Sequence, residues 1–357
     1  MKRTKGVIEK LSTQVEKKQK EDRNRKPSNR PEYDGQETTV STGSTLLDLA
    51  ISGGRFREGG IPTGIFVEIF GPASAGKTVL LCQIAGLLQR SGGKIMFHDP
   101  EARLNKQFAR MFGLVSEDLE YTIPNTIPEV FKSVRKWVPN ENEESETSYG
   151  VFADSLAALS TDMEMDKEEG DKMGMRRAKE FSEELRKTCR IITQKKVLMV
   201  CSNQVRQNSD AGPYGPRYKS PGGEAIGFYS SLRLRCMTPK KIKVKKSIHG
   251  KEHTRTIGIK TEIEVFKSSV WKPYHTADVY ILYDYGIDDI RANLRFLKST
   301  SKDSVYMLGD TKLDKSLEKA IQIVEEDGLE RELKNKVIEC WNEIEEKFEE
   351  KRKPREW

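Results

Sequence analysis

The sequence predicts an α/β fold in which helices flank a mostly parallel, twisted central sheet. Between about residues 64 and 236, short apolar runs alternate with longer amphipathic segments, a pattern typical of βαβ units. A glycine-rich segment at 71–78 stands between an apolar run and an amphipathic one, where α/β sheets carry ligand-binding turns. We expect a basic N-terminal arm and a small C-terminal α/β domain beside this core.

Each expected strand is a short apolar run, and each expected helix has apolar residues three or four positions apart. The expected strands are residues 66–70, 95–98, 150–154, 197–202 and 232–236. The expected helices are residues 77–89, 104–111, 127–138 and 176–193. Two polar, Gly-rich linkers, 161–174 and 206–223, each follow the C-terminal end of a strand, where open α/β sheets bind ligands.

The two ends of the chain differ from the core, which we place at residues 37–286. Residues 1–36 carry one apolar stripe, which includes Val7 and Leu11, and then a stretch rich in Lys, Arg, Asn and Pro. This pattern predicts a short amphipathic helix on a flexible tether. Because so short a helix is marginal in water, we expect a neighbouring subunit to cover its stripe. A helical run at 313–348 predicts a small C-terminal domain at 287–357, which ends in a charged tail.

Composition limits the class of protein. Hydrophobic residues make up 36% of the chain and charged residues 33%, which is typical of a soluble globular protein. No run approaches the roughly 18 apolar residues that a membrane span needs, and no secretory signal is recognisable, so we expect a cytoplasmic protein without a membrane partner. The five cysteines form no CxxC pair and are expected to be reduced and structural.

The net charge of +7 is unevenly distributed. The first 30 residues hold 11 Lys or Arg against 4 Asp or Glu. Such clusters attract polyanions, and phosphate contacts supply most non-specific affinity for nucleic acid. From charge alone, a solvated face or tail is an equally good interpretation. A second basic cluster, in a segment rich in β-branched residues, consists of Lys240, Lys241, Lys243, Lys245 and Lys246.

The strongest motif is GPASAGKT, between a predicted strand and a predicted helix, which is the context that a P-loop requires. Its backbone N–H groups can turn onto phosphate oxygens, and the helix N-terminus adds partial positive charge. Lys77 is expected to reach the β and γ phosphates of ATP, and Thr78 to ligate Mg²⁺. The residues expected around the triphosphate are Gly71, Pro72, Ala73, Ser74, Ala75, Gly76, Lys77, Thr78 and Val79.

Two carboxylates are expected to complete this site. Asp154 ends the apolar run 150–154 and is the candidate second metal ligand. Glu101 follows the run 95–98 and is our choice for the base that activates water. Asp99 could take that role instead, or either carboxylate could cap the helix that starts near Arg103.

Beyond the P-loop, the sequence resembles the bacterial RecA family over roughly residues 40–286. An ordered set of segments is more specific than a P-loop alone, which many folds share. The segments that carry the resemblance are STGS at 41–44 with Leu47 and Asp48, the P-loop at 71–78, DSLAAL at 154–159, NQVR at 203–206, Gly222 with Gly223, and Phe228 with Tyr229.

The resemblance implies a RecA-type P-loop ATPase with ATP and Mg²⁺ as cofactors. Such a protein forms a helical homo-oligomer on single-stranded DNA and pairs that strand with a homologous double-stranded DNA. The resemblance also makes Glu101 the catalytic carboxylate and Gln204 a sensor that couples the γ-phosphate to a DNA loop. A buried amide that satisfies loop backbone is the alternative for Gln204. Phe108 falls where the family stacks an aromatic ring on adenine, although core packing is the alternative. Phe228 would be an interface residue.

The two polar linkers match the DNA-binding loops of the family. Basic groups neutralise phosphates while apolar and aromatic side chains stack on bases, although ordinary surface loops are the alternative from sequence alone. Acidic residues in the first linker oppose DNA contact, so only its C-terminal end is expected to touch the strand. The expected DNA-binding residues are Met173, Arg176, Arg177, Arg206, Tyr214, Arg217, Tyr218 and Lys219.

One departure from the family pattern affects catalysis. The family places two lysines, two residues apart, into the ATP site of the neighbouring subunit. Here Lys267 is retained, Ser269 replaces the second lysine, and Lys272 would have to substitute for it. We therefore expect slower hydrolysis, or hydrolysis less tied to assembly. Two rival functions remain open: a RecA-fold ring helicase or DNA motor, and an ATP-binding filament or mediator scaffold with little hydrolysis.

Overall fold

The structure is a computed structural model, in which the described part of the chain begins at Thr38. The apolar stripe with Val7 and Leu11, and the expected DNA-binding residues Tyr214 and Arg217, lie outside the described part. The described residues are 38–139, 147–161, 173–207, 218–219, 223–350 and 352.

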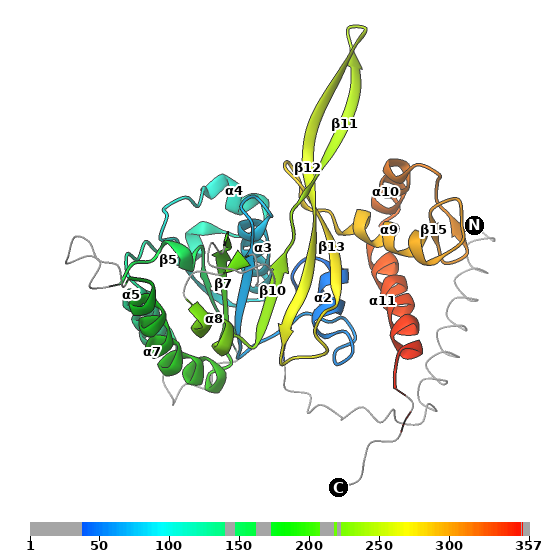
Figure 1. Ribbon diagram of the computed structural model, residues 1–357. Coiled ribbons are helices and arrows are strands. Elements are labelled where there is room, and N and C mark those ends of the chain that lie inside the picture. The colour runs from blue at the N-terminus through cyan, green and yellow to red at the C-terminus, as the bar shows by residue number, and fades with distance from the viewer. Residues whose placement is uncertain are drawn as a thin grey trace. The chain divides into compact units, whose positions relative to one another are not determined.

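One large sheet organises this part of the chain, with the strand order β14-β13-β12-β10-β3-β7-β6-β4-β5 (Figure 1). All neighbours from β10 to β5 run parallel, which confirms the expected mostly parallel sheet. The parallel strands are β3 (Phe66–Gly71), β4 (Lys94–His98), β5 (Leu119–Thr122), β6 (Tyr149–Ala153), β7 (Leu198–Gln204) and β10 (Leu232–Cys236). Only β5 was not expected, because its residues are half-buried or exposed and form no apolar run.

Beyond β10 the sheet continues with antiparallel strands that the sequence did not lead us to expect. β11 pairs with β12 in a long hairpin, and β12 then pairs with both β10 and β13. The apolar pattern is weak here because lysines occupy most of β11, and Lys is depleted in strands. These strands are β11 (Lys240–Ile248), β12 (Lys251–Ser268), β13 (Thr276–Leu282) and β14 (Gly286–Ile287).

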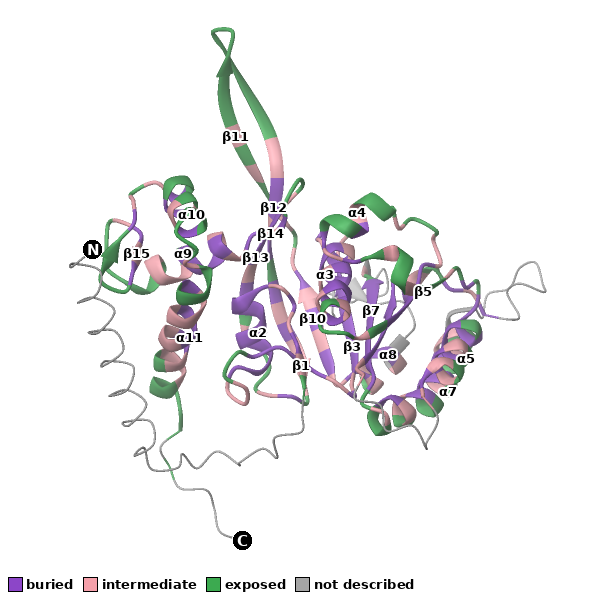
Figure 2. Ribbon diagram, turned by 180° about the vertical axis from the view of Figure 1, so that it is seen from behind, coloured by how far each residue is buried: buried purple, intermediate pink, exposed green. Residues whose placement is uncertain are grey.

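Helices cover both faces of the sheet, so its centre is buried on both sides (Figure 2). Alternate residues of β7 point to opposite faces: Leu198 and Val200 join one apolar cluster, and Met199 and Cys201 join the other. On the first face lie α2 (Thr45–Ser52), α3 (Lys77–Arg90) and α4 (Lys106–Met111). On the second lie α5 (Ile127–Trp137), α7 (Met173–Gln194) and α8 (Gly223–Tyr229).

The C-terminal segment encloses an apolar cluster of its own and also joins the main core. Its expected helical run is two helices, α10 and α11. Val337, Ile338 and Trp341 of α11 belong to the main core, and α11 contacts α2. The elements of the segment are α9 (Asp289–Thr300), β15 (Met307–Leu308), β16 (Thr311–Lys312), α10 (Leu317–Glu326) and α11 (Glu330–Lys347).

Short elements complete the description. They are β1 (Thr39–Val40), β2 (Ile61–Pro62), β8 (Arg206–Gln207), β9 (Tyr218–Lys219), η1 (Ser116–Asp118) and η2 (Leu156–Ala158). All five cysteines are free thiols, as expected. None of the described helices combines the length and the apolar character that crossing a bilayer would require.

Candidate active site

The P-loop connects the end of β3 to the start of α3, as the motif predicts. Ser74 and Gly76 have positive φ angles of 58° and 89°, conformations that turn successive N–H groups toward one centre and favour an anion there. A Cβ atom on Gly76 would lie 2.4 Å from Cδ1 of Ile281, so a side chain there would displace the end of the Ile281 side chain. Strand β13, which carries Ile281, therefore packs against the phosphate-binding turn.

Lys77 is the first residue of α3, and its side chain is largely buried. The Nζ atom donates hydrogen bonds to the carbonyl oxygens of Gly71 at 3.1 Å and Pro72 at 2.7 Å. Burial lowers the pKa of the Lys77 amine, while the carboxylate of Asp154 acts in the opposite direction. An anionic phosphate at this turn would add to the effect of Asp154 and favour the charged amine.

A hydroxyl and a carboxylate lie together beside the P-loop. Thr78 Oγ1 donates a hydrogen bond of 2.5 Å to Oδ2 of Asp154, which directly follows β6. Ser202 on β7 donates from Oγ to the other carboxylate oxygen. Hydroxyl and carboxylate oxygens suit Mg²⁺, which usually takes one or two carboxylates and leaves its other positions to phosphates and water. Thr78 and Asp154 therefore fit a magnesium nucleotide.

The two candidate bases after β4 have different surroundings. Glu101 is partly exposed; its Oε1 accepts a hydrogen bond of 3.2 Å from Ser155, the residue after Asp154. Its other oxygen forms an ion pair with Arg103 at 2.6 Å. This position puts Glu101 beside the Thr78–Asp154 pair and leaves it open to solvent.

Asp99, in contrast, is buried and holds the local backbone. Its Oδ2 accepts hydrogen bonds of 2.7 Å from the N–H of Leu104 and from the hydroxyl of Tyr121. Burial, together with the bond to Asp99, raises the pKa of Tyr121 to about 12. Asp99 thus orders the turn from which Glu101 projects.

Gln204 ends β7 and pairs in register with Gly71, the first residue of the P-loop. Its side chain is exposed, and the N–H of Val205 donates to the carbonyl of Gly71 at 3.3 Å. The strand end that precedes the second polar linker is therefore bonded directly to the phosphate-binding turn.

A buried charge pair beneath this strand end was missed by sequence reasoning. Glu68 on β3 accepts hydrogen bonds from Asn203 Nδ2 at 3.0 Å and from Arg233 Nε at 2.6 Å. The Arg233 guanidinium also lies 4.5 Å from the ring centre of Phe70. The only signal in the sequence is a charged residue inside each of two apolar strands. Removal of one partner would deprive the other of its ion pair inside the sheet.

The expected DNA-binding residues are only partly described. Arg176 is exposed at the start of α7, whereas Arg177 donates to the carbonyl oxygens of Leu156 at 3.0 Å and Ala157 at 2.7 Å. Arg177 therefore holds the turn after Asp154. The side chains of Met173, Arg206, Tyr218 and Lys219 lie outside the described part, but the backbones of β8 and β9 pair, with Arg206 opposite Lys219.

Lys267 is not brought to the P-loop of its own chain. Its Nζ atom donates to the carbonyl oxygens of Gly227 at 2.8 Å and Phe228 at 3.1 Å, at the C-terminal end of α8. Partial burial lowers the pKa of the Lys267 amine, and the guanidinium of Arg233 adds to the effect. A cation here also stabilises the end of the helix. The ring of Phe228 beside it is 76% exposed.

Three further positions complete the comparison with expectation. Phe108 packs edge-to-face on Phe112, with ring centres 4.5 Å apart, and is partly buried against the main core. Its contact with adenine stays a prediction. Ser269 bonds through its backbone N–H to the carbonyl of Ser231 at 2.7 Å, and Lys272 lies 5.3 Å from the ring centre of Trp271.

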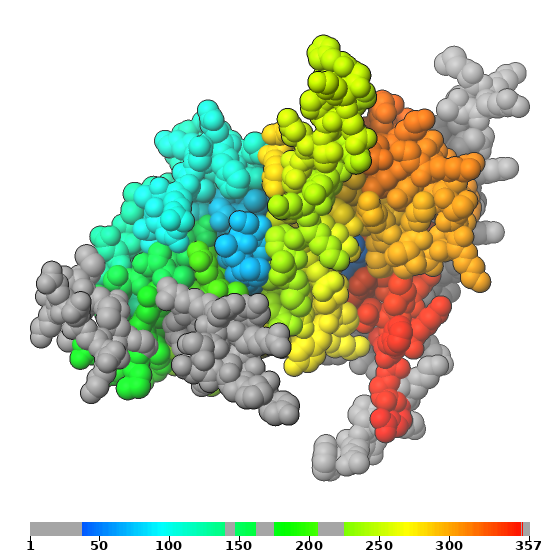
Figure 3. All heavy atoms as spheres, turned by 45° about the horizontal axis from the view of Figure 1, so that its top comes forward, coloured from blue at the N-terminus to red at the C-terminus, as the bar shows by residue number. Residues whose placement is uncertain are grey.

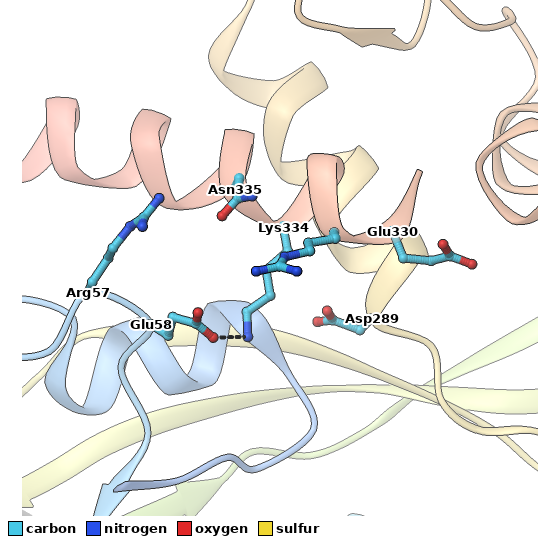
Figure 4. Close-up of a pocket in the computed structure, with 7 residues that line it drawn as sticks. Arg57, Glu58, Asp289, Glu330, Lys334 and Asn335 are labelled. Atoms are coloured by element: carbon cyan, nitrogen blue, oxygen red, sulfur yellow. Dashed lines mark hydrogen bonds and ion pairs between the residues drawn. The ribbon is translucent and has the colours of Figure 1, made fainter. Parts of the chain in front are cut away.

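A charged cavity of about 540 Å³ lies between the residues after α2 and helix α11, and none of its lining residues belongs to the P-loop site (Figure 4). Lys334 reaches from α11 to Glu58, where Nζ and Oε2 are 2.7 Å apart. The cavity is lined by Arg57, Glu58, Asp289, Glu330, Arg331, Lys334 and Asn335. The Lys334–Glu58 ion pair links α11 to the residues after α2.

Comparison with known proteins places this site in a family context. The family model described as the RecA N-terminal domain matches residues 8–288. Protein RecA of Borrelia duttonii is 30% identical over 304 residues, which cover 84% of this chain and 79% of that protein. Protein RecA of Thermus thermophilus is 30% identical over 311 residues, with coverages of 85% and 86%. Protein RecA of Wolbachia pipientis is 32% identical over 287 residues, with coverages of 78% and 75%.

Proposed function

The chain belongs to the RecA family, and from this premise we propose that it is an ATP-dependent DNA recombinase. It binds ATP with Mg²⁺ and assembles as a helical filament on single-stranded DNA. It then pairs that strand with a homologous duplex and exchanges strands.

The observation that carries this proposal is the meeting of three strand ends. The P-loop begins at the end of β3, Asp154 follows β6, and Gln204 ends β7, which lies between those two strands in the sheet. The P-loop is therefore hydrogen-bonded to Asp154 through Thr78, and to the strand end before the second polar linker through the N–H of Val205. A change at the phosphates has a direct structural route to the linker.

The residues of the chain divide the chemistry of ATP hydrolysis among them. Lys77 and the P-loop amides bind phosphate oxygens, and Thr78 with Asp154 holds the metal. Mg²⁺ held by these two residues would neutralise phosphate charge in the transition state. Glu101 orients the attacking water and accepts its proton, while Ser155 and Arg103 keep that carboxylate in place.

Gln204 links hydrolysis to DNA affinity. Its amide can hydrogen-bond the terminal phosphate, and the segment that begins at Arg206 follows two residues later. Loss of that phosphate removes the bond, so the ordered form of the segment loses its support. Single-stranded DNA would consequently bind more tightly with ATP than with ADP.

The test measures the affinity of the full-length protein for a labelled single-stranded oligonucleotide. Three conditions are compared: Mg²⁺ with a non-hydrolysable ATP analogue, Mg²⁺ with ADP, and no nucleotide. We expect the analogue to tighten binding by about 5- to 150-fold, the usual range of coupling between two sites. Gln204→Ala should remove most of that difference while nucleotide still binds. Equal affinity in all three conditions would contradict the proposal.

A second assay separates the recombinase from its rivals. Exchange between a circular single strand and a homologous linear duplex is expected for the recombinase, whereas unwinding of a forked duplex by a closed ring would favour the helicase. The Lys267 contacts with α8 and the loss of a lysine at Ser269 favour a scaffold with little hydrolysis as the second candidate. Strong stimulation of ATP hydrolysis by single-stranded DNA would exclude that scaffold.

A further inference from the structure

The hairpin of β11 and β12 extends the large sheet and projects beyond its other strands (Figures 1 and 3). A two-residue turn joins the strands, with φ angles of 51° at His249 and 74° at Gly250, as hairpins of this type require. From Ser247 to Arg255 every residue is exposed. The outer part of the hairpin thus has no role in the core.

The hairpin is strongly basic. Residues 240–260 contain eight Lys or Arg and one Glu, a net charge of +7. Two of these cations have carboxylate partners: Lys245 pairs with Glu252 at 2.8 Å and Lys260 with Asp278 at 2.5 Å. Five further lysines form no side-chain hydrogen bond or ion pair with any residue that the structure describes: Lys240, Lys241, Lys243, Lys246 and Lys251. This much unneutralised charge fits a polyanionic partner.

The register puts three of the lysines in a row. Lys241, Lys243 and Lys245 occupy alternate positions of β11 and so project from one face, roughly 7 Å apart. The opposite face carries Ile242 and Val244, which are partly buried. One face of the hairpin is therefore a line of lysines, of which Lys241 and Lys243 have no carboxylate partner among the described residues and Lys245 pairs with Glu252.

We propose that this lysine row binds double-stranded DNA through its phosphates. The segment 240–256 contains no Phe, Tyr or Trp, so it lacks the stacking platform on which unpaired bases bind. Duplex DNA keeps its bases stacked inside and offers phosphates, which lysines contact without reading sequence. A two-stranded β-ribbon also has the width that the major groove admits. The inference goes beyond the proposed function, because it assigns the duplex a surface of its own that needs no nucleotide.

The test compares two triple variants of the full-length protein that lose the same charge. The first, the row variant, replaces Lys241, Lys243 and Lys245 by Gln. The matched control removes three exposed cations on α5 and α7, namely Lys132, Lys136 and Arg190, each replaced by Gln. Affinity for a mixed-sequence duplex is measured without nucleotide at several salt concentrations. We expect the row variant to bind at least about tenfold more weakly, with the salt slope reduced by about 2.7, and the control to stay within about twofold of wild type.

Direct protection of the lysines gives a second readout. Acetylation of Lys241, Lys243 and Lys245, followed by mass spectrometry, should slow when duplex is added, whereas acetylation of Lys132 and Lys136 should not. Wild-type duplex affinity in the row variant would overturn the proposal, and so would an equal loss in the control, which would assign the effect to net charge. ATP hydrolysis stimulated by single-stranded DNA should be unchanged in the row variant. If single-stranded DNA did not stimulate ATP hydrolysis by the wild-type protein, that result would contradict the proposed function and leave the duplex-binding proposal untouched.

Discussion

Asp154 illustrates what could be seen in the sequence and what could not at the scale of single residues. The carboxylate was expected because it follows an apolar strand, and the P-loop residues were expected because their motif is local. Ser202, which donates to Asp154, lies 48 positions away, and Arg233 lies 165 positions from Glu68. The order of strands in the sheet creates both contacts, and no local pattern encodes them.

The choice of catalytic base leads to a first prediction. Glu101→Gln should reduce ATP turnover about 100-fold or more, the usual contribution of a general base, while ATP and DNA binding remain. Asp99→Asn is the matched control, because an amide oxygen can still accept the bonds from Leu104 and Tyr121. Steady-state hydrolysis with single-stranded DNA is the measurement. Normal turnover in Glu101→Gln, with loss in Asp99→Asn, would move the role to Asp99.

Asp48 carries a prediction about pH. Its buried carboxyl accepts hydrogen bonds from Ser41 Oγ and from the N–H and Oγ1 of Thr42. Burial raises its pKa from 3.8 to about 7, against the effect of those bonds. Between pH 4 and 7 the folded protein therefore keeps a proton that the unfolded chain has lost. The contribution of Asp48 to the free energy of unfolding therefore falls as pH rises through this range, by up to about 1.4 kcal/mol per pH unit.

Asp48→Asn removes that contribution, so the variant should gain stability relative to wild type from pH 5 to pH 7. Urea denaturation at several pH values measures the difference. Most other titrating groups are common to both proteins and cancel in the comparison, whereas buried Asp289 interacts with the Asp48 charge, so the difference reports Asp48 together with that interaction. Parallel profiles for the two proteins would show that Asp48 does not titrate in this range.

At the scale of elements, the buried parallel strands were predictable, whereas the half-buried or exposed parallel strand β5 and the antiparallel strands were not. A strand buried on both faces is a continuous apolar run, as in β7, and stands out in any sequence. β11 consists largely of lysines, and its strand conformation depends on pairing with β12. The helices α3 and α5 were found within one residue at each end, because amphipathic spacing extends over their whole length.

The end of α8 leads to a prediction about assembly. The side chain of Phe228 is 76% exposed, and Lys267 donates hydrogen bonds to the carbonyl oxygens beside it. An exposed aromatic ring in a fixed position suits an interface between protomers. Phe228→Ala should give smaller assemblies on single-stranded DNA with an ATP analogue, as measured by sedimentation velocity. Phe348→Ala is the matched control, since that ring is 79% exposed at the end of α11. Equal assembly sizes for both variants and wild type would remove Phe228 from the interface.

For the molecule as a whole, the C-terminal segment is tied to the core by α11. Trp341 is buried and lies with its ring centre 5.4 Å from that of Trp271. Trp341→Ala should therefore destabilise the whole described unit by about 3–5 kcal/mol, whereas Phe348→Ala should stay within about 0.5 kcal/mol. Urea denaturation followed by circular dichroism checks this. A small loss confined to a separate early transition would mean that the segment unfolds alone.

The hairpin also has a consequence for solubility. Among the described strands, β11 pairs only with β12, so its outer edge offers free backbone groups to another copy of the chain. Exposed strand edges invite aggregation, and lysines along an edge oppose it by mutual repulsion. Five of the nine residues of β11 are Lys. The lysines that we propose as DNA ligands thus also prevent the free protein from aggregating through this strand edge.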